Sequence, residues 1–190
     1  MASAFTAVYD ACVLYPAPLR DLLLRLGAAG LFRARWSNEI NDEWSRNLRQ
    51  NRPDIPADRI NALVDLVNQS VPDCLVTGHE NLVGGLQLPD SDDRHVLAAA
   101  IRSGAGVIVT YNLKDFPDPE LAKYGIEVQH PDTFVLHLLD LLPGPVTGVV
   151  KELRAALRNP PRTAEELLAT LEQQQLVATV SRLREMISLI

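Results

Sequence analysis

Short apolar runs alternate with helical stripes along the first two thirds of the chain. Five segments predict β-strands: 5–9, 31–36, 75–77, 107–110 and 126–129. The segment 31–36 is predicted from its alternation, which places Arg33 and Arg35 on one polar face. Between them, apolar residues recur three or four positions apart, which predicts helices: 19–26, 37–48, 60–67, 92–101 and 118–123. Regular alternation of strand and helix favours an α/β fold, in which a parallel sheet is flanked by helices on both faces.

The pattern changes after Pro131, where strand signals stop. Four helical stretches are predicted there: 133–142, 146–158, 163–173 and 175–188. Pro143-Gly144-Pro145 is expected to end the helix at 133–142, and Thr163 with Glu166 resembles a capping box. We therefore predict an α/β domain over residues 1–142 and an all-helical C-terminal extension over residues 143–190.

Composition restricts the class of protein. The 190 residues, 47% of them hydrophobic, are enough for one sizeable core with an extension. Two cysteines are too few for a disulfide framework. No apolar run approaches the roughly 20 residues of a membrane span, and the start, Met1 to Phe5, lacks the positive charge of a signal peptide. We expect a cytoplasmic protein without a membrane partner.

The net charge of −6 is unevenly distributed. Residues 1–59 carry a balance of +1, residues 60–132 a balance of −7, and residues 133–190 a balance of zero. Such a chain is not a strongly basic, non-specific binder of nucleic acid. Fifteen of the 18 basic residues are arginine, the side chain that grips phosphate oxygens with two parallel hydrogen bonds.

Carboxylates lie where the predicted strands end. They are Asp10 after the first strand, Glu39 and Glu43 after the second, Asp90, Asp92 and Asp93 before the helix at 94–101, and Asp115 after the fourth strand. Ligands of parallel sheets bind at the carboxyl ends of the strands. Taken singly, each acid also fits a turn, a helix cap or a solvated helix face.

If these acids converge, their mutual repulsion requires a cation. Ligation by oxygen alone selects Mg²⁺ or Mn²⁺, and such ions suit the chemistry of phosphate esters. The sequence leaves open which of Asp90, Asp92 and Asp93 is the main ligand, although the helix register favours Asp93.

Four motifs carry a resemblance to a known family: Val8–Leu14, Ser37–Glu43, Asp93–Ala100 and Val109–Phe116. Together they resemble the PIN-domain ribonucleases, in particular the VapC-type toxins of toxin–antitoxin pairs, over about residues 4–131. The family often has Thr or Ser just after the first Asp, where this chain has Ala11 and Cys12. A hydroxyl that orients the metal shell is therefore expected to be missing.

The resemblance implies a metal-dependent endoribonuclease. Asp10, Glu43, Asp93 and Asp115 are then expected to hold one or two Mg²⁺ or Mn²⁺ ions and to act in catalysis, with Thr110 and Asn112 hydrogen-bonding around them. It also implies RNA as the substrate, a cognate antitoxin protein as inhibitor, and a homodimer. Two alternatives stay open: a catalytically silent PIN-like binding module, and a metal phosphoesterase that acts on DNA or a small phosphate ester.

The histidines, cysteines and tryptophans are expected to have structural and not catalytic roles. The histidines, among them His79 and His95, lack the spacing of a zinc site and are expected on the surface or in the core. Cys12 and Cys74 are expected to be small buried hydrophobic residues, and Trp36 and Trp44 core residues. Three arginines could guide RNA or belong to a solvated helix face: Arg46, Arg49 and Arg52.

Overall fold

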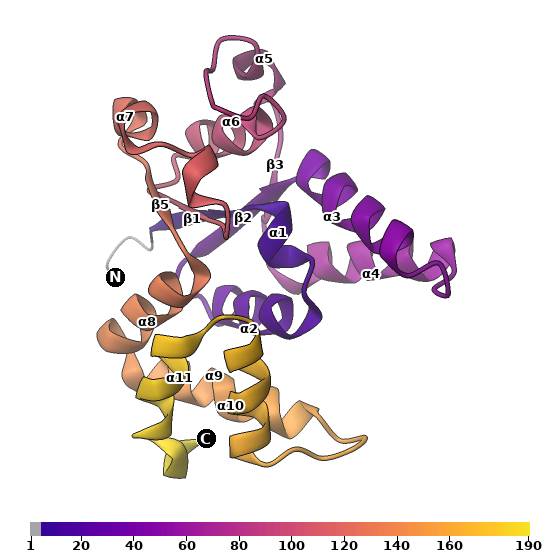
Figure 1. Ribbon diagram of the computed structural model, residues 1–190, viewed down its shortest axis with the longest axis vertical. Coiled ribbons are helices and arrows are strands. Elements are labelled where there is room, and N and C mark those ends of the chain that lie inside the picture. Colours follow the sequence, from indigo (N-terminus) through magenta and orange to yellow (C-terminus); the bar gives the residue numbers. More distant parts are fainter. Residues whose placement is uncertain (1–4) are drawn as a thin grey trace.

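The fold is built on one parallel sheet of five strands in the order β3-β2-β1-β4-β5 (Figure 1). This computed structural model describes residues 5–190. The strands are β1 (Thr6–Tyr9), β2 (Arg33–Ser37), β3 (Leu75–Val76), β4 (Val107–Val109) and β5 (Glu127–Gln129). All five predicted strands are present, and every pairing is parallel. The expectation about the N-terminal leader rests mainly on residues 1–4, which lie outside the described residues.

Strand β1 is the centre of the sheet. Its Ala7 lies opposite Ala34 of β2 on one side and Val107 of β4 on the other. All four residues of β1 are buried, which explains why this strand is a continuous apolar run and not an alternating one. The backbone N–H of Asp10 extends the pairing by donating to the Val109 carbonyl at 3.1 Å. The first predicted acid therefore lies between the ends of β2 and β4.

Helices cover both faces of this sheet, as predicted. In residues 5–130 they are α1 (Ala11–Leu14), α2 (Ala17–Ala28), α3 (Asn38–Asn51), α4 (Ala57–Ser70), α5 (Glu80–Val83), α6 (Arg94–Ser103) and α7 (Asp118–Leu121), with short 3-10 helices η1 (Leu113–Asp115) and η2 (Ala122–Tyr124). Helix α6 packs across β1 to β4, whereas α2 lies beneath β2 in Figure 1. The sequence did not predict α1 and α5, because four residues are too few to show a helical period.

Close packing of α2 on the sheet depends on Gly27. A Cβ atom at this position would lie 3.0 Å from the Cβ of Ala34 in β2, which is closer than side chains normally approach. Glycine therefore lets the helix backbone lie directly against the strand.

A buried polar network fixes the start of α3. The Trp36 indole N–H donates to Asn68 Oδ1 at 2.8 Å, and the Asn41 amide donates to the same oxygen at 3.0 Å. Asn41 Oδ1 in turn accepts from the Trp44 indole at 3.1 Å. Both tryptophans are fully buried, so the predicted core role of Trp36 and Trp44 is confirmed. Because the network joins β2 to α3 and α4, it sets the direction in which α3 leaves the sheet.

The C-terminal segment is all helical, as predicted. It comprises α8 (Pro131–Leu141), α9 (Pro143–Ala156), α10 (Ala164–Gln173), α11 (Val177–Arg184) and η3 (Ile187–Leu189). The predicted capping box is present, since Thr163 and Glu166 bond reciprocally at the start of α10. The predicted end of the first of these helices before Pro143-Gly144-Pro145 is confirmed, since α8 ends at Leu141. The next helix begins at Pro143 and not at 146, because proline lacks only an N–H that the first helical turn does not use.

These helices continue the hydrophobic core of the sheet domain. Helices α9 and α10 pack on α2, and Val150 and Leu168 belong to the same buried cluster as Leu22. The boundary at residues 142 and 143 stays a prediction. In residues 5–190 no helix is long and apolar enough to cross a membrane.

Candidate active site

Asp10 is the most buried of the four predicted acids, with 2% of its surface exposed. Its Oδ1 accepts a 2.6 Å hydrogen bond from the N–H of Ala11 and so caps α1. Its Oδ2 accepts from the Thr110 hydroxyl at 2.6 Å and from the Cys12 thiol at 3.2 Å. Burial raises the pKa of Asp10, the Thr110 and Cys12 hydrogen bonds oppose that rise, and the charge of Glu43 adds to it.

An open acidic pocket of about 640 Å³ lies beside Asp10 at the carboxyl ends of β1, β2 and β4. It is lined by Glu39, Asp42, Glu43, Arg46, Asn47, Asp90, Asp92, Asp93, His95, Asn112 and Asp115. Three of the four predicted acids therefore line one pocket. The fourth, Asp10, is buried next to it and is close enough for its charge to act on Asp93.

Asp93 shows most directly that the acids converge. Burial, the largest cause, and the charges of its acidic neighbours together raise its pKa to about 7. In order of effect, these neighbours are Asp10, Asp90, Asp115 and Glu43. Asp93 occupies the N-cap position of α6, but its side chain makes no capping hydrogen bond. The carboxylate therefore does not cap the helix through a hydrogen bond, and it stays free to bind a ligand.

Glu43 enters the pocket from α3. Ser37 accepts a 3.3 Å hydrogen bond from the N–H of Ile40 and so starts this helix, as predicted. Two turns later, Glu43 Oε2 lies 3.4 Å from His95 Nε2 of α6. His95 is therefore a neighbour of a predicted metal ligand. No pattern in the sequence indicated this contact, because the two residues are distant in the chain.

Asp115 lies in η1, directly after β4. The Thr110 hydroxyl accepts from the N–H of Asn112 at 3.0 Å, and the Asn112 carbonyl accepts from the N–H of Asp115 at 3.0 Å. The neighbouring Tyr111 donates its hydroxyl hydrogen to the Gln174 carbonyl at 2.8 Å. The loop that carries Asp115 is thus held by the strand on one side and by the C-terminal helices on the other.

Asp90 and Asp92, the other two candidates for the main ligand, are more exposed than Asp93. Asp90 accepts the N–H of Asp92 at 2.9 Å, and both side chains are exposed at the rim of the pocket. Asp93 is less exposed than either, and it interacts with Asp10, Glu43 and Asp115. This supports Asp93 as the ligand favoured by the helix register, and the assignment stays a prediction.

Cys12 has a role that the sequence did not indicate. Burial and the charge of Asp10 raise the pKa of its thiol, which therefore stays protonated and donates to Asp10. The hydroxyl expected to be missing beside the first Asp is supplied by Thr110, 100 positions along the chain. Cys74, by contrast, is buried in the core, as predicted.

Arg46 is the arginine of the predicted trio that lines the pocket. Arg49 donates to Asn61 at 2.7 Å, and Arg52 pairs with Asp54 at 2.7 Å. Arg46 is therefore the member of the three that is placed to meet a phosphate in the pocket.

The donor set of the pocket fits a hard divalent cation. Carboxylates outnumber the pocket's single arginine, and their repulsion raises the pKa of Asp93. In residues 5–190, no three of the four predicted acids bring ligand atoms within 4.8 Å of one another. A cation that draws them together would offset the repulsion, and oxygen ligands suit Mg²⁺ or Mn²⁺.

Comparison with protein-family models matches residues 6–114 to the PIN domain. The chain belongs to the PIN-domain family. Residues 131–185 match a second family model, the VapC50 C-terminal domain. The predicted resemblance to VapC-type PIN proteins is thereby confirmed, and most of the helical extension lies within the second match.

One curated relative of this PIN-domain chain is a protein of Mycobacterium tuberculosis (strain ATCC 25618 / H37Rv) named "Putative ribonuclease VapC50". It is 42% identical over 120 residues, which make up 60% of this chain and 70% of the relative. No solved structure matches the chain.

Proposed function

We propose that this PIN-domain protein is a metal-dependent endoribonuclease and the toxin of a type II toxin–antitoxin pair in the cytoplasm. The observation that carries the proposal is that Glu43, Asp93 and Asp115, from three separate segments of the chain, line one pocket. The buried Asp10 lies beside them, and its charge acts on Asp93. A PIN domain and a relative named as a ribonuclease support the same activity.

In this proposal Asp10, Glu43, Asp93 and Asp115 hold one or two Mg²⁺ or Mn²⁺ ions. When bound, such an ion would neutralise phosphate charge and lower the pKa of a water molecule, so that this water can attack a phosphodiester. The Thr110 hydroxyl and the Cys12 thiol hold Asp10 Oδ2 in a fixed direction. Such hydrogen bonds hold the carboxylate in the orientation that a metal ion requires, so the side chain rearranges less when the ion binds.

Residues that line the pocket are placed to bind the substrate. Arg46 can donate to a phosphate of the RNA, and Asn47 and Asn112 line the same pocket with amide groups that can donate to phosphate or ribose oxygens. The pocket is open, which suits a polymer that passes through it.

The decisive experiment maps RNA 5′ ends after expression of the wild type and of Asp10→Asn, together with cleavage by the purified proteins in Mg²⁺ and in EDTA. We expect new 5′ ends and cleavage only for the wild type with metal. Asp65→Asn, an exposed acid of α4 outside the pocket, is the matched control and should cleave normally. Equal cleavage by Asp10→Asn, or full activity in EDTA, would refute the metal-dependent mechanism at the four acids.

The same assay separates the two alternatives. A wild type that cleaves no nucleic acid and no phosphate ester under any metal condition would indicate a silent binding module. Preference for DNA or for a small phosphate ester over single-stranded RNA would indicate a phosphoesterase.

The partners belong to the proposal as well. We expect a cognate antitoxin that places a basic residue among the acids, because a cation is the chemical complement of this pocket. We also expect a homodimer. Light scattering of the purified chain tests the dimer, and loss of cleavage on addition of the antitoxin tests the inhibitor.

A further inference from the structure

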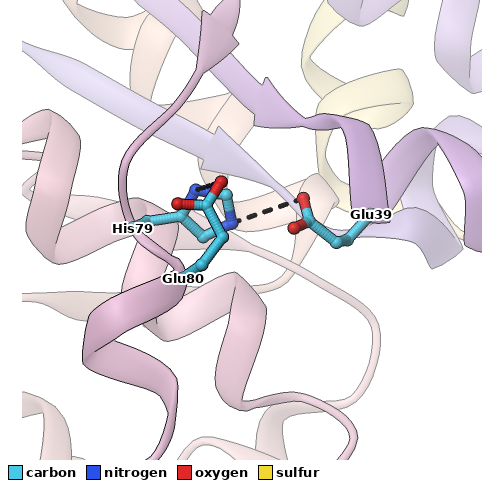
Figure 2. A group of neighbouring side chains, drawn as sticks. All are labelled: Glu39, His79 and Glu80. Atoms are coloured by element: carbon cyan, nitrogen blue, oxygen red, sulfur yellow. Dashed lines mark ion pairs between the residues drawn. The ribbon is translucent and has the colours of Figure 1, made fainter.

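A second group of potential metal ligands lies at the edge of the acidic pocket. It consists of Glu39 in the first turn of α3, and of His79 and Glu80 where α5 begins (Figure 2). Figure 2 shows both carboxylates directed at the imidazole ring from different sides. One ligand atom from each residue falls within 4.8 Å of the other two.

His79 is the unusual member of this group. Its ring is 1% exposed, yet neither Nδ1 nor Nε2 has a hydrogen-bond partner. Nε2 lies 3.4 Å from Glu39 Oε2, and Nδ1 lies 3.9 Å from Glu80 Oε1. Buried polar groups are nearly always satisfied, so an unpartnered imidazole between two carboxylates indicates a ligand between them.

The spacing of these atoms fits a coordinated ion. Zn²⁺ binds His nitrogen and carboxylate oxygen at about 2.0–2.2 Å in a tetrahedron, whose ligand atoms lie roughly 3.3–3.6 Å apart. The 3.4 Å between His79 Nε2 and Glu39 Oε2 matches one edge of such a tetrahedron. Rotation of Glu80, whose side chain is 60% exposed, can supply the third ligand, and water can occupy the fourth position.

We propose that Glu39, His79 and Glu80 form a second cation site, distinct from the four-acid site and selective for Zn²⁺. The imidazole sets the selectivity, because nitrogen ligands suit Zn²⁺ whereas Mg²⁺ prefers oxygen alone. The four-acid site has the opposite preference.

The position of the second site gives it a structural role. Glu39 precedes Glu43 by one turn of α3, and the segment that follows Glu80 leads to Asp93. An ion held by Glu39 and His79 therefore ties α3 to the start of α5, and so links the two segments that carry two of the proposed catalytic acids. This inference concerns metal binding and does not depend on the proposed nuclease activity.

The competing explanation is a protonated imidazole that is paired with both glutamates. It requires no metal, and it predicts that Zn²⁺ binds no more tightly with His79 than without it.

The test is a calorimetric titration of Zn²⁺ into the full chain carrying Asp93→Asn, which weakens the four-acid site. In this background we expect one Zn²⁺ per chain. Glu80→Gln and His79→Gln should each lower the Zn²⁺ affinity at least about tenfold, because loss of even an outer hydrogen-bonding partner of a metal ligand costs that much. The exposed Glu152→Gln of α9 is the matched control and should bind Zn²⁺ like its parent.

Two further readouts make the test decisive. Co²⁺ bound in place of Zn²⁺ should give the intense visible absorption of a tetrahedral site, and His79→Gln should abolish it. If His79→Gln fails to fold, Glu80→Gln decides, because its side chain is exposed and unnecessary for the core. Absence of Zn²⁺ binding in the Asp93→Asn parent, or unchanged affinity in Glu80→Gln, would overturn the proposal. Failure of RNA cleavage would not affect it.

Discussion

The Thr110 hydroxyl donates a 2.6 Å hydrogen bond to Asp10 Oδ2 and so joins the carboxyl ends of two neighbouring parallel strands. Thr110 also accepts the N–H of Asn112. One buried hydroxyl therefore orients the first acid and the loop that carries the last one.

Removal of this hydroxyl should weaken the four-acid site. Thr110→Val keeps the shape of the side chain but leaves Asp10 without its main donor, which raises the pKa of Asp10 further. We expect Mg²⁺ affinity to fall about 10- to 100-fold, as for other outer partners of metal ligands. Calorimetry with Mg²⁺ measures the change. Thr110→Ser, which retains the hydroxyl, is the control, and equal affinities in the two variants would contradict the role of Thr110.

The raised pKa of Asp93 predicts how stability depends on pH without metal. The folded state holds the Asp93 proton up to about pH 7, whereas the unfolded chain releases it near the ordinary value of 3.8. Because the folded pKa is raised, the contribution of this group to the free energy of unfolding decreases as the pH rises from 3.8 to about 7. Above pH 7 the contribution stays low. Asp10, with its pKa raised by burial, acts in the same direction.

Urea unfolding in EDTA over pH 5 to 8, the part of this range that lies above the titration of ordinary carboxylates, checks the expectation. Asp93→Asn lacks the titrating group, so its stability relative to the wild type should increase as the pH rises. Parallel pH profiles for the two proteins would show that the pKa of Asp93 is not raised in the folded protein.

Addition of Mg²⁺ should restore the stability that the folded protein loses as the pH rises. A ligand that binds only the folded state at 100 times its Kd stabilises it by about 2.7 kcal/mol. We therefore expect the unfolding temperature at pH 8 to rise with Mg²⁺ concentration. Asp10→Asn should show little of this rise, and Asp65→Asn should show all of it. An equal rise in all three proteins would place the bound Mg²⁺ elsewhere.

The contact between the extension and the sheet domain makes a separate prediction. The Asp132 carboxylate accepts 2.8 Å hydrogen bonds from the N–H groups of Ala178 and Thr179, and so caps α11. Asp132→Ala should lower the free energy of unfolding by about 0.5–2 kcal/mol, as for other lost caps. Asp140→Ala is the control, because Asp140 is half exposed and faces Arg182 at 3.8 Å. Its cost should lie near the 0–1 kcal/mol of a surface pair. Equal losses would contradict the cap.

Much of the sheet and the acidic site could be predicted because the signals are local. An apolar run followed by Asp10, and a helix opened by Ser37, each specify their own structure within a few residues. The carboxyl ends of parallel strands then meet at one edge, which is why Asp10 and Asp115 could be expected near each other.

What could not be predicted depends on contacts between distant segments. The strand order and the approach of His95 to Glu43 arise only when the helices pack. His79 appeared to be an ordinary surface or core histidine, because its partner Glu39 lies 40 positions earlier and no metal-binding spacing connects the two.

The central place of β1 has a consequence for the order of events during translation. The ribosome makes Asp10 first, but its hydrogen-bonding partner Thr110 follows 100 residues later, and Asp115 later still. A nascent chain therefore holds an incomplete set of acids until β4 and its loop have left the exit tunnel. If the chain cuts RNA as proposed, a truncated product that stops before residue 115 is harmless to the cell that makes it.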